Sequence, residues 1–156
     1  MKLPIITERL ILRKLTLDDV DNIFLLDSNP DVMKYVGVPI ASSKEESKKL
    51  IENILHQYEK NGTGRLAVIE KETNKFIGWS GIKLLTEEVN GFNNVYELGY
   101  RFFLEFWRKG YATESAKASL DLGFNQLNAD KIYAYADVDH HSSNQILTKL
   151  GFKNKG

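Results

Sequence analysis

The chain has 156 residues, of which 42% are hydrophobic and 27% charged, and this size and composition predict one globular domain over residues 1–156. Its 21 basic and 21 acidic residues cancel, so we expect no nucleic-acid partner, because general polyanion binders carry a basic surplus. It contains no cysteine and no apolar run long enough for a signal peptide or a bilayer span, which excludes thiolate chemistry and favours a cytoplasmic protein without a membrane partner.

The first part of the chain predicts one strand and two helices. Residues 8–15 have the pattern of a short, half-buried strand. Thr16 followed by Asp19 is typical of a helix N-terminal cap, and the helix that follows is expected to stop at 28–30. A second helix is expected over 43–60 because its apolar residues form one stripe, and the sequence NGTG at 61–64 ends it.

The middle of the chain predicts three consecutive strands, at 65–71, 75–85 and 95–104. The turns between them are short, which favours antiparallel pairing. In the third strand the residues alternate, so that Glu97, Gly99, Arg101 and Phe103 share one face.

The last part predicts a helix that starts near Tyr111, a strand at 131–138 and a short helix at about 143–150. A strand–helix–strand unit places its two strands parallel. The expected fold is therefore α/β (α+β): a mixed, mostly antiparallel central sheet flanked by helices, with one parallel crossover.

The stretch FWRKGYAT, residues 106–113, stands directly before the third long helix. The first turn of a helix has backbone N–H groups without partners, and Arg108 and Lys109 add positive charge beside them. Gly110 either allows a strand to turn into a helix or lets the backbone approach an anion such as a pyrophosphate. Spacing alone leaves both readings open.

Two segments taken with this loop carry a family resemblance. The run ELGYRFFLEFWRKGYATESAKASLDLGF, followed by SNQILTKLGF, resembles the GNAT superfamily of acetyl-coenzyme A-dependent N-acetyltransferases. Within it, the chain is similar to the branch that contains the ribosomal-protein alanine N-acetyltransferases. The resemblance implies a GNAT-like fold, acetyl-coenzyme A as co-substrate, and acetyl transfer to a primary amine in a ternary complex.

The resemblance also implies which residues contact the coenzyme. The backbone N–H groups of the phosphate loop would bind the pyrophosphate, and the end of the preceding strand would pair with the pantetheine arm. His140 stands where the branch has an asparagine, and it is either a coenzyme contact or a solvated turn residue. The implied coenzyme-binding residues are Phe102, Phe103, Leu104, Arg108, Lys109, Gly110, Tyr111, Ala112, Thr113 and His140.

Two residues are candidates for catalysis. Glu97 matches the place where several superfamily members have a catalytic glutamate. Otherwise it is an exposed carboxylate or a partner of Arg101, and the proton is equally well removed through an ordered water. Ser143 matches a serine that lies near the coenzyme sulfur, and is therefore a candidate acid; otherwise it is the N-cap of the last helix. The adjacent His140 and His141 lack the carboxylate or cysteine cluster of a metal site, so we expect no metal.

The acceptor amine stays open, since a protein N-terminus, a polyamine, an amino sugar or an antibiotic would each fit. A coenzyme-A-binding or regulatory module without turnover is the alternative to an enzyme. The chain ends at GFKNKG, where the branch continues into a further strand, so the resemblance implies that a C-terminal strand is missing. An open sheet edge of that kind favours pairing, and a homodimer is a further expectation.

Overall fold

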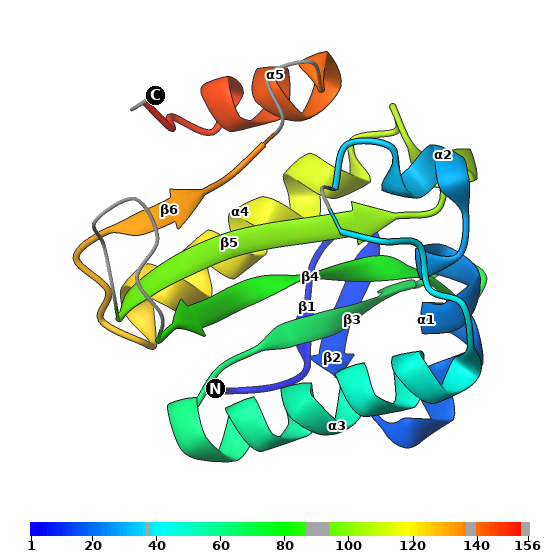
Figure 1. Cartoon of the computed structure of the whole chain (residues 1–156). Coiled ribbons are helices and arrows are strands. Elements are labelled where there is room, and N and C mark those ends of the chain that lie inside the picture. Colours follow the sequence, from blue (N-terminus) through cyan, green and yellow to red (C-terminus); the bar gives the residue numbers. More distant parts are fainter. Residues whose placement is uncertain (37, 87–93, 137–139, 154–156) are drawn as a thin grey trace.

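A computed structural model describes residues 1–36, 38–86, 94–136 and 140–153 and contains one six-stranded sheet in the order β1-β2-β3-β4-β5-β6 (Figure 1). The strands are β1 (Ile5–Ile6), β2 (Leu10–Lys14), β3 (Arg65–Glu70), β4 (Lys75–Leu85), β5 (Val95–Phe102) and β6 (Ile132–Ala134). The helices are α1 (Val20–Asp27), α2 (Pro30–Met33), α3 (Lys44–Asn61), α4 (Tyr111–Asn125) and α5 (His141–Lys149). Two 3-10 helices of one turn each are η1 (Leu17–Asp19) and η2 (Leu104–Phe106).

Strands β1 to β5 pair antiparallel, and β6 joins β5 in parallel after the crossover helix α4. The β5–β6 ladder is short: Tyr96 pairs with Ile132, and Leu98 with Ala134. Because β5 continues to Phe102, its last residues pair with no strand on the β6 side within the part of the chain that the structure describes. The sheet is therefore split at this point.

Helix caps explain where η1 begins and where α3 begins and ends. Thr16 and Asp19 form a capping box at η1, which continues into α1. The Ser43 hydroxyl accepts from the Glu46 N–H at the start of α3, and Gly62 ends that helix in the left-handed conformation, which glycine adopts without strain.

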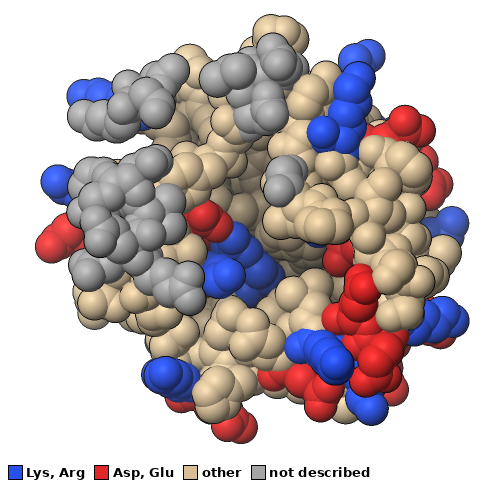
Figure 2. All heavy atoms as spheres, viewed as in Figure 1, with Lys and Arg blue, Asp and Glu red and all other residues tan. Residues whose placement is uncertain are grey.

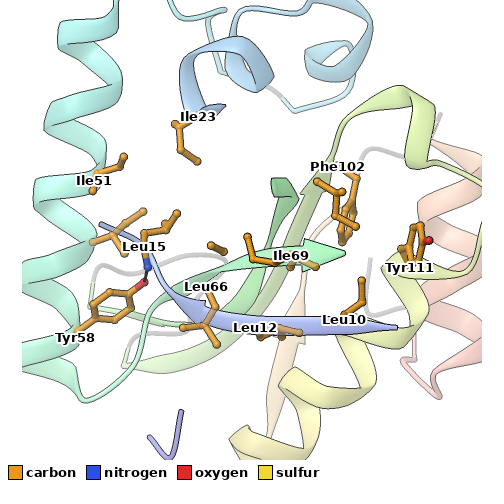
Figure 3. Close-up of a cluster of buried hydrophobic side chains, with 14 residues drawn as sticks. Leu10, Leu12, Leu15, Ile23, Ile51, Tyr58, Leu66, Ile69, Phe102 and Tyr111 are labelled. Carbon is orange, nitrogen blue, oxygen red and sulfur yellow. Dashed lines mark hydrogen bonds between the residues drawn. The ribbon is translucent and has the colours of Figure 1, made fainter. Parts of the chain in front are cut away.

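Both faces of the sheet are covered, which explains why four consecutive residues of β3, Leu66 to Ile69, are buried. Helix α4 packs on one face, where Ser119 contacts Ser80, and it lies behind the sheet in Figure 1. Helices α1 and α3 pack together on the other side. The main core combines Leu10 and Leu12 of β2 with side chains of α1, α3 and β3 (Figure 3).

Tyr58 of α3 fixes the start of two elements within this core. Its hydroxyl donates to the Arg65 carbonyl and accepts from the Leu15 N–H at 3.0 Å (Figure 3). Burial raises the pKa of Tyr58 to about 12, so the phenol is neutral at physiological pH. The same contact holds Arg65 at the beginning of β3.

The predicted fold class is confirmed, including the single parallel crossover, whereas several boundaries differ. The strand expected at 95–104 ends at Phe102, because Leu104 begins the 3-10 turn η2. The strand expected at 131–138 is β6, of three residues; positions 137 and 138 lie outside the described residues. Two short elements, β1 and α2, were not expected, because two and four residues give no periodic pattern.

Candidate active site

A cavity of about 790 Å³ lies at the split between β5 and β6. Its walls come from β5, the loop 106–113, α5, and the segment that follows α2. Figure 2 shows a hollow in the middle of this face, with basic and acidic side-chain atoms on its floor. Glu97, Ser143, Arg108 and Gly110 all line the cavity, so the structure brings the candidate catalytic residues and the phosphate loop together.

The phosphate loop has two residues in the left-handed region. Gly110, the N-cap of α4, has φ +83°, and Arg108 has φ +61°. Helix α4 begins without a side-chain cap, and the first amide to donate within it is that of Glu114, to the Gly110 carbonyl at 3.0 Å. The N–H groups of residues 111–113 are therefore available at the positive end of the α4 dipole, which is the geometry that binds phosphate.

The N-terminal segment holds this loop from behind. Arg9 donates to the Lys109 carbonyl at 2.8 Å and to Glu114 Oε1 at 2.7 Å, while Thr7 donates to Glu114 Oε2 at 2.6 Å. Burial alone would raise the pKa of Glu114, but these hydrogen bonds hold it below its ordinary value of 4.5. The loop is thus fixed by contacts that are about a hundred residues distant in sequence.

The end of β5 presents backbone groups to the cavity. The Phe103 N–H donates to Ile77 on the β4 side at 3.1 Å, so by alternation the groups of Phe102 point toward the split. The Phe102 carbonyl accepts from the Trp107 indole at 2.8 Å, and Leu104 lies in η2 rather than in extended backbone. The pantetheine contacts implied for Phe102, Phe103 and Leu104 stay predictions.

Glu97 lies half-buried in the cavity and forms an ion pair with Arg65, through the carboxylate oxygen Oε1. The expected alternative partner, Arg101, instead contacts Asp27 at 2.6 Å. Arg65 also donates to the carbonyls of Gly81 at 2.8 Å and Glu97 at 2.9 Å, and burial lowers its pKa despite the Glu97 charge. Arg65 therefore orients the Glu97 carboxylate, and no other described residue donates to its second oxygen.

Ser143 shares a hydrogen bond of 2.9 Å with the hydroxyl of Tyr100, which comes from β5. Ser143 is the third residue of α5 and not its N-cap: the helix begins at His141, earlier than expected, with His140 as the cap residue. Burial raises the pKa of Tyr100, partly offset by the Ser143 bond, so the phenol keeps its proton. The pair Tyr100–Ser143 is uncharged and lies at the cavity wall.

His140 lies between two aromatic rings at the rim of the same cavity. It stacks on Tyr35 with ring centroids 4.9 Å apart, and Trp107 contacts it at 5.8 Å. These contacts connect α5 to the phosphate loop and to the residues that follow α2. The role implied for His140 toward the coenzyme stays a prediction.

Sequence reasoning missed Arg65, Tyr35 and Tyr100 as site residues. Tyr100 could have been found, because alternation along β5 places it on the face opposite Glu97, toward the last helix. Arg65 and Tyr35 were missed because only the tertiary structure brings β3 and the residues that follow α2 to the cavity. Within the described residues no group of three or more His, Asp or Glu side chains is placed to hold a metal ion.

The sheet split at β5, with the uncapped start of α4 beside it, is the arrangement expected from the resemblance to acetyl-coenzyme A-dependent N-acetyltransferases. The sequence model of the acetyltransferase (GNAT) domain matches residues 9–153, and the chain belongs to this family. It is an N-acetyltransferase of that family, as the resemblance implied.

Curated relatives agree with this assignment. The uncharacterized N-acetyltransferase YoaA of Bacillus subtilis (strain 168) is 32% identical over 150 residues, which are 96% of this chain and 82% of that protein. The spermidine N(1)-acetyltransferase of Escherichia coli (strain K12) is 30% identical over 145 residues, which are 93% of this chain and 73% of that protein.

Solved structures agree as well. Spermidine N-acetyltransferase from Vibrio cholerae, in complex with CoA and spermine, has a TM-score of 0.80 and 25% identity, and the match covers 96% of this chain and 84% of that one. A ribosomal-protein-S5-alanine acetyltransferase from Vibrio fischeri shares the fold, with a TM-score of 0.80 at 19% identity over 99% and 85% of the two chains. No helix among the described residues combines the length and apolarity needed to cross a bilayer.

Proposed function

We propose that this chain transfers the acetyl group of acetyl-coenzyme A to a primary amine by direct attack in a ternary complex. The observation that carries the proposal is that one cavity is lined both by the uncapped start of α4 and by Glu97 and Ser143. The first element suits a pyrophosphate, and the two side chains suit proton transfer.

The coenzyme half of the cavity is the phosphate loop with the unpaired end of β5. The N–H groups of residues 111–113 would bind the pyrophosphate, with Arg108 and Lys109 adding charge. An approach of the phosphates to the backbone requires a residue without a bulky Cβ at Gly110, where an added Cβ would lie 3.1 Å from Arg9. The residues present fit acetyl-coenzyme A.

The reaction requires removal of a proton from the ammonium and protonation of the sulfur. Glu97, directly or through a water molecule, would accept the proton, because one of its carboxylate oxygens is held by Arg65 and the other is available. The amine nitrogen then bonds to the thioester carbon, the carbon–sulfur bond breaks, and the nitrogen loses a second proton, which replaces the one that passes from Ser143 to the sulfur. Ser143, itself bonded to Tyr100, would donate to the leaving sulfur.

Thiol release measured with acetyl-coenzyme A and a panel of primary amines tests the proposal. The panel includes spermidine, because two relatives are named for it, and a peptide with a free N-terminus. We expect turnover with at least one amine, and we expect Glu97→Gln to lower kcat by about 10²-fold or more while coenzyme affinity is retained. If the coenzyme binds but no amine releases thiol above background, the chain is a coenzyme-binding module instead.

A further inference from the structure

The acceptor side of the cavity contains an unusual arrangement of two guanidinium groups on one indole ring. Arg65 and Arg101 lie over the ring of Trp79, with their Cζ atoms 5.2 and 5.0 Å from its centroid. The strand register explains this, since Trp79 of β4 pairs directly with Arg101 of β5, and Arg65 of β3 is two residues along the same face. All three residues line the cavity.

These two guanidinium groups differ in the number of contacts that they already make. Arg65 donates through Nη1 to two carbonyls and through Nη2 to the Glu97 carboxylate. Arg101 donates through Nη1 to Asp27 at 2.6 Å, and no other described residue accepts from it. A guanidinium has five N–H donors, and none of the nitrogen atoms of Arg101 is both buried and unpaired. Arg101 lines the cavity, and only its Nη1 donates to a described residue.

Basic side chains outnumber acidic ones in the described lining of the cavity, where Arg65 is paired with Glu97 and Arg101 with Asp27, which does not line it. Among the described residues that line it, Arg65, Arg101, Arg108 and Lys149 are basic, and Glu97 is the acid. Arg108 and Lys149 belong to the phosphate loop and to α5, which leaves the Arg65–Arg101 pair for the acceptor. The two positive charges also repel each other, since the charge of Arg101 contributes to the lowered pKa of Arg65. An anion placed beside Trp79 would reduce that repulsion.

From these contacts we infer that the acceptor is a small amine that also carries a carboxylate, as a free amino acid or short peptide does, and that Arg101 binds this carboxylate. The inference rests on the proposed function and names its substrate class. A guanidinium binds a planar carboxylate through two parallel N–H donors, and the indole of Trp79 packs against the carbon chain that connects the carboxylate to the amine. A polyamine, which presents further ammonium groups, would meet like charge at this place.

Matched acceptors test the inference with the protein as it is. Thiol release is measured for β-alanine and glycylglycine, for the amide of each, and for spermidine. We compare the acid-to-amide ratio of kcat/KM between variants, so that the intrinsic reactivity of each amine cancels. Loss of a charge-assisted pair of hydrogen bonds is expected to lower this ratio by about tenfold or more.

The variant is Arg101→Gln combined with Asp27→Asn, because removing Arg101 alone would leave the buried Asp27 carboxylate without a partner. The matched control is Arg13→Gln combined with Asp19→Asn, which removes another pair of an arginine with a buried carboxylate, outside the cavity. The control is expected to keep the wild-type acid-to-amide ratio. Arg101→Lys, which keeps the charge but not the planar fork, is expected to give an intermediate ratio.

A binding measurement decides the inference even without turnover. Calorimetry compares N-acetyl-β-alanine with its amide on the coenzyme A-loaded protein, and the acid is expected to bind at least about tenfold more tightly in wild type only. Equal binding of acid and amide, an acid-to-amide ratio unchanged in the Arg101 variant, or a preference for spermidine would each overturn the inference. Absence of thiol release with every amine would contradict the proposed function instead, and the binding result would still stand.

Discussion

Replacing Arg108 by glycine separates two effects of this residue on the phosphate loop, backbone strain and charge. Arg108 has φ +61°, and an L-residue in the left-handed region costs about 1–2 kcal/mol relative to its ordinary conformation. Glycine removes this strain, but it also gives the unfolded chain more conformational freedom, which destabilises the folded state by about 0.4–1 kcal/mol. Relative to Arg108→Ala, Arg108→Gly should therefore stabilise the protein by about 0.5–1 kcal/mol.

Thermal unfolding without ligand measures the strain, and coenzyme titration measures the charge. The glycine variant should melt about 1–4 °C above the alanine variant. Both variants should bind acetyl-coenzyme A about two- to fivefold more weakly than wild type at low salt, and less so at high salt, because an exposed arginine is screened. Equal melting temperatures for the two variants would refute the strain argument, and tighter binding by the glycine variant would show that Arg108 crowds the phosphates.

Three further predictions concern hydrogen bonds in the core, at the start of α4 and at the cavity wall. Tyr58→Phe removes the hydroxyl that bonds two backbone groups in the core, and should cost about 1–3 kcal/mol in chemical denaturation; a loss below that range would contradict the role given to this bond. The hydrogen bond from Tyr111 holds the pKa of Glu70 below its ordinary value of 4.5, so its stabilisation is present above that pH and is lost as the pH falls through the lower folded value. Wild type should accordingly lose melting temperature in acid more steeply than Glu70→Gln, and parallel pH profiles would exclude this linkage. Ser143→Ala should lower kcat about tenfold or more with little change in coenzyme affinity, and Tyr100→Phe, which keeps the ring, should reproduce part of that loss; an unchanged kcat in both would remove the pair from the proton transfer.

The fold could be predicted because the chain's local patterns agree with its tertiary structure. The strand 75–85 and the helix that ends at NGTG match β4 and α3 within a residue, since periodicity, caps and glycine stops act locally. Boundaries failed where tertiary contacts decide them. Residue 104 continues an alternating pattern, yet the indole of Trp107 bonds to the Phe102 carbonyl and the chain turns before it.

The sequence predicted which segments meet at the candidate site, but it did not predict which side chains are in contact there. Glu97 and Ser143 were expected at one site and both line the cavity, whereas their partners Arg65 and Tyr100 were not expected. One alternative reading made Glu97 a partner of Arg101, four residues away on the same strand, but four residues of extended chain span about 13 Å. Arg65 comes from β3, which is separated from β5 by β4. Its side chain reaches Glu97 by passing over Gly81 and Gly99, which have no side chains. Glycines opposite each other on adjacent strands are the signal that could have indicated a long side chain lying over them.

The attachment of Arg9 and Thr7 to the start of α4 makes the first strands and the phosphate loop one thermodynamic unit. A ligand that orders residues 108–113 then also favours the docked N-terminal segment, and by reciprocity, release of that segment weakens the ligand. Amide hydrogens of β1 and β2, which lie away from the cavity lining, should consequently exchange more slowly when acetyl-coenzyme A is bound. A tag or truncation at the N-terminus should therefore change the affinity for the coenzyme.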